Sequence, residues 1–115
     1  MIEGIRYLLI VALLLALTGC SDEDPTIDRV ANVGNGQTLY TQYCSLCHGP
    51  DGAGGEVGRA MGRIPDLRTS DGMSQARIAR VVLHGQGRMR GWAGMLELDE
   101  AQDIAVYVKG LAHGG

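Results

Sequence analysis

Residues 44–48 read Cys-Ser-Leu-Cys-His, and this pentapeptide constrains the chain more than any other stretch. Cys-x-x-Cys-His is the attachment sequence of c-type haem. Two cysteine sulfurs at this spacing, at the start of a helix, lie on one side and can each form a thioether with a haem vinyl group. The next residue projects onto the same face, where its imidazole can bind the iron. The sequence therefore predicts one covalently bound haem c, held by Cys44 and Cys47, with His48 as an axial ligand of the iron.

Two other uses of a Cys-x-x-Cys pair are half of a zinc site and a redox dithiol of the thioredoxin kind. A structural zinc site needs a complete tetrahedral set of ligands, and the one cysteine left over, Cys20, has another assignment. A redox dithiol follows a strand in a βαβ unit, and no strand pattern precedes residues 44–47. Haem attachment is therefore the favoured interpretation.

The composition agrees with a haem protein. The chain has 115 residues, including 18 glycines, one tryptophan, four tyrosines and no phenylalanine. This length limits the chain to one small domain. So few aromatic residues make a poor core from protein alone, at a size where burial is already marginal. A buried haem would supply the missing apolar volume.

Residues 1–19 have the pattern of an export signal. Arg6 gives its positive charge, and the apolar run that follows is too short to span a bilayer comfortably. The run ends in Leu-Thr-Gly-Cys at positions 17–20, which resembles the lipobox of bacterial lipoproteins. That resemblance implies cleavage before Cys20, lipidation of this cysteine, and a domain anchored on the periplasmic side of a bacterial membrane. An ordinary signal peptide, or an uncleaved anchor helix, is the alternative.

Residues 20–35 are acidic at first and show no periodicity, so they predict a flexible tether. The haem domain then comprises residues 36–115. Haem c is attached outside the cytoplasm, so the motif and the export signal agree on the location of the domain.

The domain is expected to contain helices only. The first helix runs over residues 36–47, and a glycine-rich loop follows over residues 49–65, where glycines let the backbone approach a flat ligand. A further helix begins after Ser74, a good N-cap, and stops at His84 and Gly85.

The last helix is expected to begin at Asp99, with Gln102 as its partner in a capping box, and to stop near Gly110. No stretch shows the sustained alternation of a half-buried strand. The predicted fold class is therefore all-α.

The helices around the Cys-x-x-Cys-His motif resemble those of class I cytochrome c, of the small monohaem bacterial kind, over residues 34–112. In that family the N- and C-terminal helices cross, with a glycine and an aromatic residue of the first helix against an aliphatic and an aromatic residue of the last. Gly36 and Tyr40 match the first pair, and Ile104 and Tyr107 match the second. The resemblance implies three to four helices around one covalently attached haem.

The same resemblance implies a methionine in the loop before the last helix as the sixth ligand of the iron. Met89 matches that place, with Arg90 where the family usually has a proline. Met95 and Met61 are the other candidates. His84 would give bis-histidine ligation instead, although a histidine at a helix C-terminus more often interacts with the helix dipole.

Further residues are expected near the haem. The carbonyl of Pro65 is a candidate acceptor for the proximal imidazole, and Trp92 resembles an aromatic residue that packs beside a propionate. Positive charge in this region would neutralise propionates and steer an acidic redox partner. The arginines between residues 59 and 90 are Arg59, Arg63, Arg68, Arg77, Arg80, Arg88 and Arg90. Of these, Arg77 and Arg80 are expected to be ordinary solvated residues of a helix face.

These features predict an electron-transfer protein rather than an enzyme, because two filled axial positions leave no site for a substrate. One alternative is the haem subunit of a larger oxidoreductase. Another is an open-site haem peroxidase or gas-binding protein, which would need a distal group such as His84. The expected partners are redox proteins and, through Cys20, the membrane. Nucleic acid is excluded, because the protein is exported and its formal net charge is −3.

Overall fold

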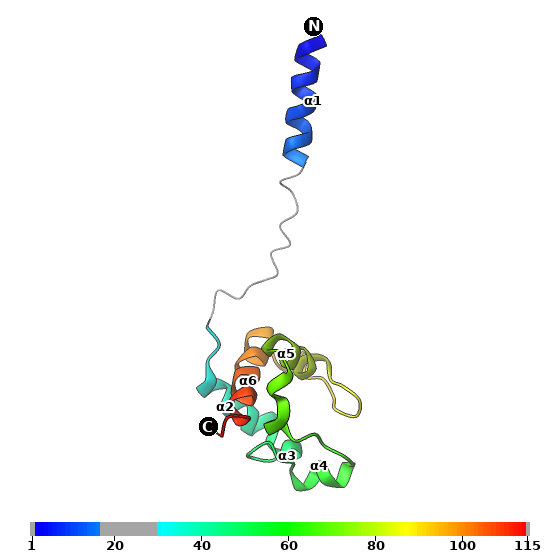
Figure 1. The fold of residues 1–115 in the computed structure, drawn as a ribbon. Helices are drawn as coiled ribbons and strands as arrows, with labels where there is room; N and C mark the ends of the chain where they lie inside the picture. The colour runs from blue at the N-terminus through cyan, green and yellow to red at the C-terminus, as the bar shows by residue number, and fades with distance from the viewer. Residues whose placement is uncertain (1, 17–29, 115) are drawn as a thin grey trace.

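The computed structural model describes residues 2–16 and 30–114, so Cys20 and most of the expected tether lie outside the described residues. The helices are α1 (Ile2–Ala16), α2 (Val33–Tyr43), α3 (Ser45–His48), α4 (Glu56–Met61), the 3-10 helix η1 (Leu67–Gly72), α5 (Gln75–His84) and α6 (Leu98–Leu111). In these described ranges the chain forms isolated bridges but no strand, which confirms the all-α prediction (Figure 1). None of the described helices is long and apolar enough to cross a membrane.

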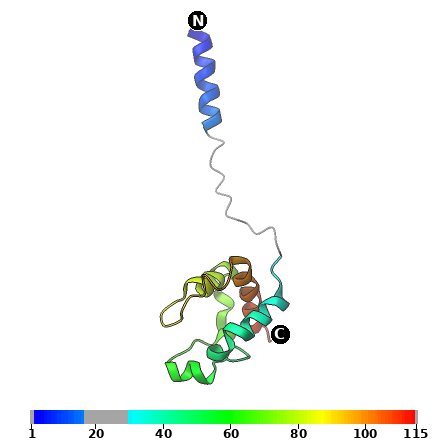
Figure 2. The same cartoon turned by 180° about the vertical axis from the view of Figure 1, so that it is seen from behind.

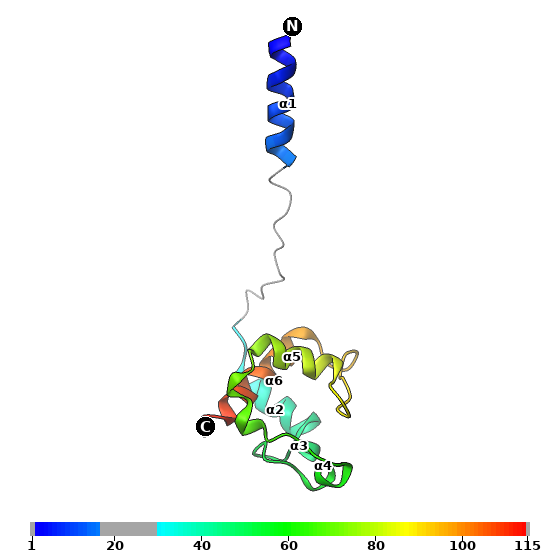
Figure 3. The same cartoon turned by 45° about the vertical axis from the view of Figure 1, so that its right-hand side comes forward.

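Helices α2 and α6 pack across each other in the middle of the domain (Figure 3). Gly36 permits the close approach, since a Cβ atom there would overlap the backbone carbonyl of Asp103. Further along α2, the buried ring of Tyr40 contacts the ring of Tyr107, with 5.2 Å between the ring centroids. Ile104 is completely buried on the same side of α6. The expected contact between the terminal helices is confirmed.

The carboxylate of Asp103 fixes the start of α2. Asp103 is 0% exposed, and it accepts hydrogen bonds from the backbone N–H of Asn32 (2.7 Å) and from Nδ2 of Asn35 (2.8 Å). The side chain of Asn32 in turn accepts the backbone N–H of Asn35, which makes Asn32 the N-cap. A buried carboxylate requires such partners. Because of them, α2 begins at Val33, three residues before the predicted start at residue 36.

The helix predicted over residues 36–47 is divided in two. Helix α2 ends at Tyr43, and Cys44, with φ of −117°, widens the turn before α3. Helical hydrogen bonds continue through this point: the N–H of Cys44 donates to Tyr40 (2.8 Å), and the N–H of His48 donates to Cys44 (2.9 Å). The motif therefore remains one helical turn despite the change of direction.

The glycine-rich segment over residues 49–65 is not entirely a loop, because it contains α4. Gly55 is the N-cap of this helix and Glu56 lies in its first turn. Glycine is a poor helix former, so α4 was not predicted from the sequence. Gly58 lets α4 approach α3, since a Cβ atom there would overlap the carbonyl of Cys47.

Helix α5 agrees with the prediction at both ends. The hydroxyl of Ser74 accepts the backbone N–H of Arg77 at 3.2 Å, as an N-cap does. The helix ends at His84, and its C-cap Gly85 has φ of +76°. This positive φ favours glycine and ends the helix.

Helix α6 begins one residue earlier than predicted and with a different cap. Its capping box consists of Glu97 and Glu100, and not of Asp99 and Gln102. The Glu100 carboxylate accepts the backbone N–H of Glu97 at 2.8 Å. Both pairs have the same spacing, so the pattern alone could not distinguish them. The helix ends at Leu111, one residue beyond the predicted stop.

Candidate haem-binding site

Helix α3 and the residue before it present two thiols on one turn. Cys44 and Cys47 are both free, with Cys44 buried and Cys47 half-buried. Burial raises the pKa of the Cys44 thiol to about 11, and the neighbouring Cys47 adds to the effect. At neutral pH the Cys44 side chain is therefore a neutral thiol. Two such thiols at this spacing can each form a thioether with a vinyl group of a haem.

His48 completes the donor set at the end of α3. Its Nδ1 is buried and has no hydrogen-bond partner among the residues that the structure describes. Burial also lowers the pKa of His48, which keeps the imidazole neutral at pH 7, the form that binds a metal. Buried polar atoms without a protein partner are rare and call for a specific explanation. A neutral imidazole of this kind beside two thiols fits haem c.

Pro65 and Arg63 are both exposed, in the stretch between α4 and η1. The hydrogen bond expected from the His48 imidazole to the Pro65 carbonyl is not formed in the described part of the chain, because Nδ1 has no partner there. The roles of Pro65 and Arg63 near a haem stay predictions.

The loop that follows His48 wraps around the end of α3. Three carbonyls of the motif accept backbone N–H groups from this loop: Ser45 from Gly49 (2.8 Å), Cys47 from Gly55 (2.8 Å) and His48 from Gly54 (2.7 Å). A Cβ atom at Gly55 would lie 2.5 Å from the carbonyl oxygen of Leu46. The loop glycines were expected to approach a flat ligand, but those at positions 55 and 58 approach the backbone of α3. This packing satisfies carbonyls that a four-residue helix leaves unpaired.

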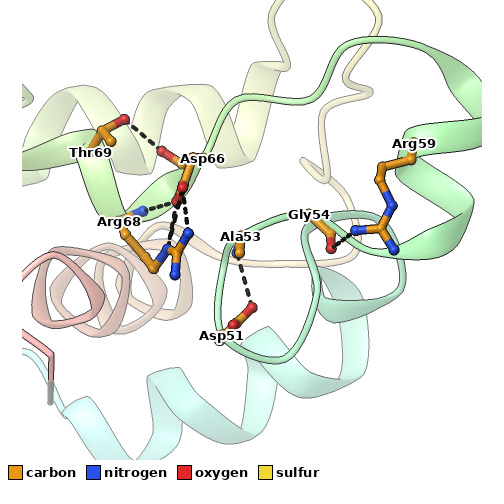
Figure 4. Close-up of polar contacts among 7 residues, drawn as sticks. All are labelled: Asp51, Ala53, Gly54, Arg59, Asp66, Arg68 and Thr69. Atoms are coloured by element: carbon orange, nitrogen blue, oxygen red, sulfur yellow. Dashed lines mark hydrogen bonds and ion pairs between the residues drawn. The ribbon is translucent and has the colours of Figure 1, made fainter.

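Polar side chains hold the same loop in shape (Figure 4). The carboxylate of Asp51 accepts the N–H of Ala53 at 3.0 Å, and the guanidinium of Arg59 donates to the carbonyl of Gly54 at 2.8 Å. At the start of η1, Arg68 forms an ion pair of 2.7 Å with the N-cap residue Asp66, and this pairing lowers the pKa of the Asp66 carboxyl. In this structure the guanidinium groups of Arg59 and Arg68 are therefore engaged by the protein itself.

Met89 lies in a short, well-supported loop. Two hydrogen bonds fold the loop back on itself. The N–H of Gln86 donates to the carbonyl of Met89 at 3.1 Å, and the N–H of Met89 donates to the carbonyl of Gln86 at 3.0 Å. Past the turn, the N–H groups of Trp92 and Ala93 each donate at 2.9 Å to carbonyls in the last turn of α5. These bonds fix the loop although Arg90 occupies the place where the family usually has proline. The loop and the α3–α4 segment extend to the same side of the domain (Figures 1 and 2).

The other candidate ligands differ from Met89 in exposure. Met89 is half-buried, whereas the side chains of Met61 and Met95 are 55% and 57% exposed. His84 is also exposed. The burial pattern favours Met89, and its ligation of the iron remains a proposal.

Trp92 connects the Met89 loop to the cysteine motif. Its ring meets the ring of Tyr43 edge-on at 5.2 Å between centroids, and Tyr43 directly precedes Cys44. The guanidinium carbon of Arg90 lies 4.5 Å from the centroid of Trp92, a cation–π contact. The sequence had indicated Trp92 and Arg90 separately, but not their contact or the part of Tyr43. The placement of Trp92 beside a propionate stays a prediction.

Curated relatives of this chain include two CcoP subunits of cbb3-type cytochrome c oxidase. The subunit from Cereibacter sphaeroides is 29% identical over 107 residues, which cover 91% of this chain and 34% of the relative. The subunit from Azospirillum brasilense is 32% identical over 84 residues, which cover 69% of this chain and 28% of that subunit. Quinohemoprotein alcohol dehydrogenase ADH IIB of Pseudomonas putida is 34% identical over 76 residues, which cover 64% of this chain and 10% of the dehydrogenase. The chain therefore spans no more than about a third of these relatives.

Two solved structures are also similar to this chain. The KustC0563 c-type cytochrome has a TM-score of 0.59 and 26% identity, over 66% of this chain and 95% of that one. Dihydro-heme d1 dehydrogenase NirN has a TM-score of 0.55 and 30% identity, over 65% of this chain and 16% of the NirN chain. Residues 31–108 match the family described as cytochrome c oxidase, cbb3-type, subunit III. This chain belongs to that family of c-type cytochromes, and its cofactor is covalently bound haem c.

Proposed function

We propose that this protein is an electron carrier in which His48 and Met89 bind the haem iron from opposite faces. The observation that carries the proposal is the single helical turn that presents two free thiols and a neutral imidazole. When bound, the haem supplies an iron that exchanges one electron between the ferrous and ferric states. The part of the protein is to hold both axial ligands in place.

The support for Met89 comes from its loop. The side chain is half-buried, the backbone on both sides is hydrogen-bonded, and the loop extends to the same side as α3. A thioether ligand opposite histidine raises the reduction potential of haem iron. With both axial positions filled, no substrate binds and no bond is made, so the proposed function is not that of an enzyme.

An acidic redox protein is the proposed partner. Among the described residues Arg68 is paired with Asp66, and no other arginine pairs with a described acidic side chain. Arg77 and Arg80 are exposed on α5, and Arg88 and Arg90 are exposed in the Met89 loop. Positive charge that the domain does not neutralise attracts an acidic surface during brief encounters.

Absorbance spectra test the ligation. We expect a sharp low-spin α-band in the reduced protein and a weak sulfur-to-iron band in the red or near infrared in the oxidised protein. Met89→Ala should lose the sulfur band, whereas Met95→Ala, a change of an exposed side chain, should keep it. A sulfur band that survives in Met89→Ala would transfer the role to another methionine. A high-spin ferric wild type that rapidly binds cyanide would instead favour an open-site haem protein.

The membrane anchor is proposed to be lipid on Cys20, which lies outside the described residues. Its support is the Leu-Thr-Gly-Cys sequence at the end of the apolar run. More than one acyl chain is sufficient for stable anchoring on the periplasmic side of a bacterial membrane. Cys20→Ala should move the haem protein from the membrane fraction to the soluble fraction, and Ser21→Ala should not. Retention of the Cys20→Ala protein after an alkaline wash would contradict a lipid anchor.

A second candidate function is that of a haem subunit in a larger oxidoreductase. The observation that favours it is the similarity to two proteins named as subunits of cbb3-type oxidases. The two candidates differ in one respect that can be measured. A subunit copurifies in fixed proportion with other chains from detergent-solubilised membranes, whereas a free carrier purifies alone.

A further inference from the structure

Tyr40 reaches from α2 to the residue that follows the proposed axial histidine. Its hydroxyl donates a hydrogen bond of 2.6 Å to the carbonyl oxygen of Gly49, and both residues are buried. Burial raises the pKa of Tyr40 well above its ordinary value, with smaller contributions from Cys44 and Tyr107. The hydroxyl is therefore a neutral donor. A short hydrogen bond in such an environment is stronger than one exposed to water.

Gly49 is held from other directions as well. Its N–H donates to the carbonyl of Ser45 at 2.8 Å, and its own carbonyl also accepts the N–H of Gly52 at 3.3 Å. Its φ is +78°, and a Cβ atom there would lie 2.9 Å from the carbonyl oxygen of Gly54. The Gly49–Pro50 peptide, one residue beyond His48, therefore has one orientation, and the Tyr40 hydroxyl is the side chain that holds it.

The other end of this link is the most buried part of the domain. The side chain of Tyr40 is 1% exposed, and its ring is packed against Tyr107 where α2 and α6 cross. The hydroxyl is thus anchored to the helix crossing, while its acceptor is covalently next to His48. A rigid connection runs from the crossing, through one hydrogen bond, to the backbone of the proximal ligand.

We infer that Tyr40 is a positioning residue for the haem: by holding Gly49, it sets the plane of the His48 imidazole at the iron. The inference rests on the proposed ligation by His48 and Met89. Hydrogen bonds to the surroundings of a ligating histidine orient its ring and tune the metal. Here the bond acts through the main chain and not through the ring nitrogen, which has no partner among the described residues.

Electron paramagnetic resonance of the oxidised holoprotein tests this role, because the g values of a low-spin haem depend on the orientation of its axial ligands. Tyr40→Phe keeps the ring and removes only the hydroxyl. It should shift the highest g value or broaden its line, whereas the matched control Tyr107→Phe should keep the wild-type signal. Gly49→Ala disturbs the same peptide from the other end and should also change the signal, in contrast to Gly72→Ala, where nothing lies within 4 Å.

Two outcomes contradict different claims. If both Tyr40→Phe and Gly49→Ala keep the wild-type g values, and Tyr40→Phe only unfolds more easily, then Tyr40 has a structural role alone and the inference is wrong. If the wild-type protein itself is high-spin, ligation by His48 and Met89 is wrong, and the inference is wrong with it. A low-spin wild type with an altered Tyr40→Phe signal supports the inference, and the sulfur-to-iron band tests separately whether Met89 is the second ligand.

Discussion

Arg88 lies beside the proposed ligand Met89 and reaches back to an earlier part of the chain. Its Nη1 donates a hydrogen bond of 2.9 Å to the carbonyl of Met61, 27 residues away, at the end of α4. A Cβ atom at Gly62 would lie 2.9 Å from the same nitrogen, so the guanidinium also fits closely against this turn. The bond ties the Met89 loop to the segment that packs on α3. A loop tied in this way opens less often.

Arg88→Ala should therefore make Met89 easier to displace from the ferric iron. An exposed hydrogen bond from a charged donor contributes about 1 kcal/mol, so we expect imidazole to replace Met89 about fivefold faster. Stopped-flow absorbance measures this rate. Arg80→Ala removes the same charge from the surface of α5 and is the matched control. Equal acceleration in both variants would show that net charge, and not the bond to Met61, controls the exchange.

Among single residues, the sequence predicted those whose role follows from their immediate neighbours in the chain. Cys44, Cys47 and His48 are adjacent on one turn, and their chemistry follows from residue type and spacing alone. The bonds from Arg88 to Met61 and from Tyr40 to Gly49 cross between elements. They depend on where flexible side chains meet backbone carbonyls after packing, and no periodicity records this.

Among the elements, the crossing of α2 and α6 depends on the absence of one methyl group. The two backbones approach so closely that a Cβ atom on Gly36 would overlap the carbonyl of Asp103. Because this obstacle is backbone, it cannot rotate away as a side chain could. The helices would have to separate, and the contact between Tyr40 and Tyr107 would open with them.

Gly36→Ala should thus lower the free energy of unfolding by about 1–3 kcal/mol, the usual cost of overpacking a tight core contact. Denaturant unfolding of the holoprotein, followed by circular dichroism, measures the change. Gly110→Ala on α6 is the control, because a Cβ atom there meets nothing within 4 Å. Because Gly110 lies in the last turn of α6, alanine there should leave the free energy of unfolding unchanged or raise it by less than about 1 kcal/mol. Similar effects of the two changes would contradict the proposed tightness of the crossing.

Helix existence was easier to predict than helix ends. The crossing pair and α5 carry apolar periodicity, and the prediction of these helices is confirmed, whereas only α5 has the caps that were predicted. Helix α4 was missed because glycines dominate its neighbourhood, and it is stabilised by packing on α3 and not by its own propensity. The start of α2 depends on Asp103, which lies 71 residues from its partner Asn32. A cap supplied from the far end of the chain cannot be seen in a local window.

For the whole molecule, composition already indicated that the cofactor contributes to the core. The buried apolar side chains among the described residues gather around the α2–α6 crossing and α5. They include Tyr40, Ile78, Val82, Leu96, Ile104 and Val108, with alanines between them. A cluster of this size is small for a stable domain, and a buried haem adds the apolar contact that such a core needs. The relative placement of the Met89 loop and α3 was not predictable, since it depends on how these parts pack.

The hydrogen bond between Asn35 and Asp103 joins positions 68 residues apart, near the two ends of the domain. Synthesis starts at the N-terminus, so Cys-Ser-Leu-Cys-His is made well before the last helix, which covers Tyr40. Contacts between distant positions form later in folding than local ones. We therefore expect the thiols of the motif to stay accessible until α6 is complete, and the domain to become compact only then.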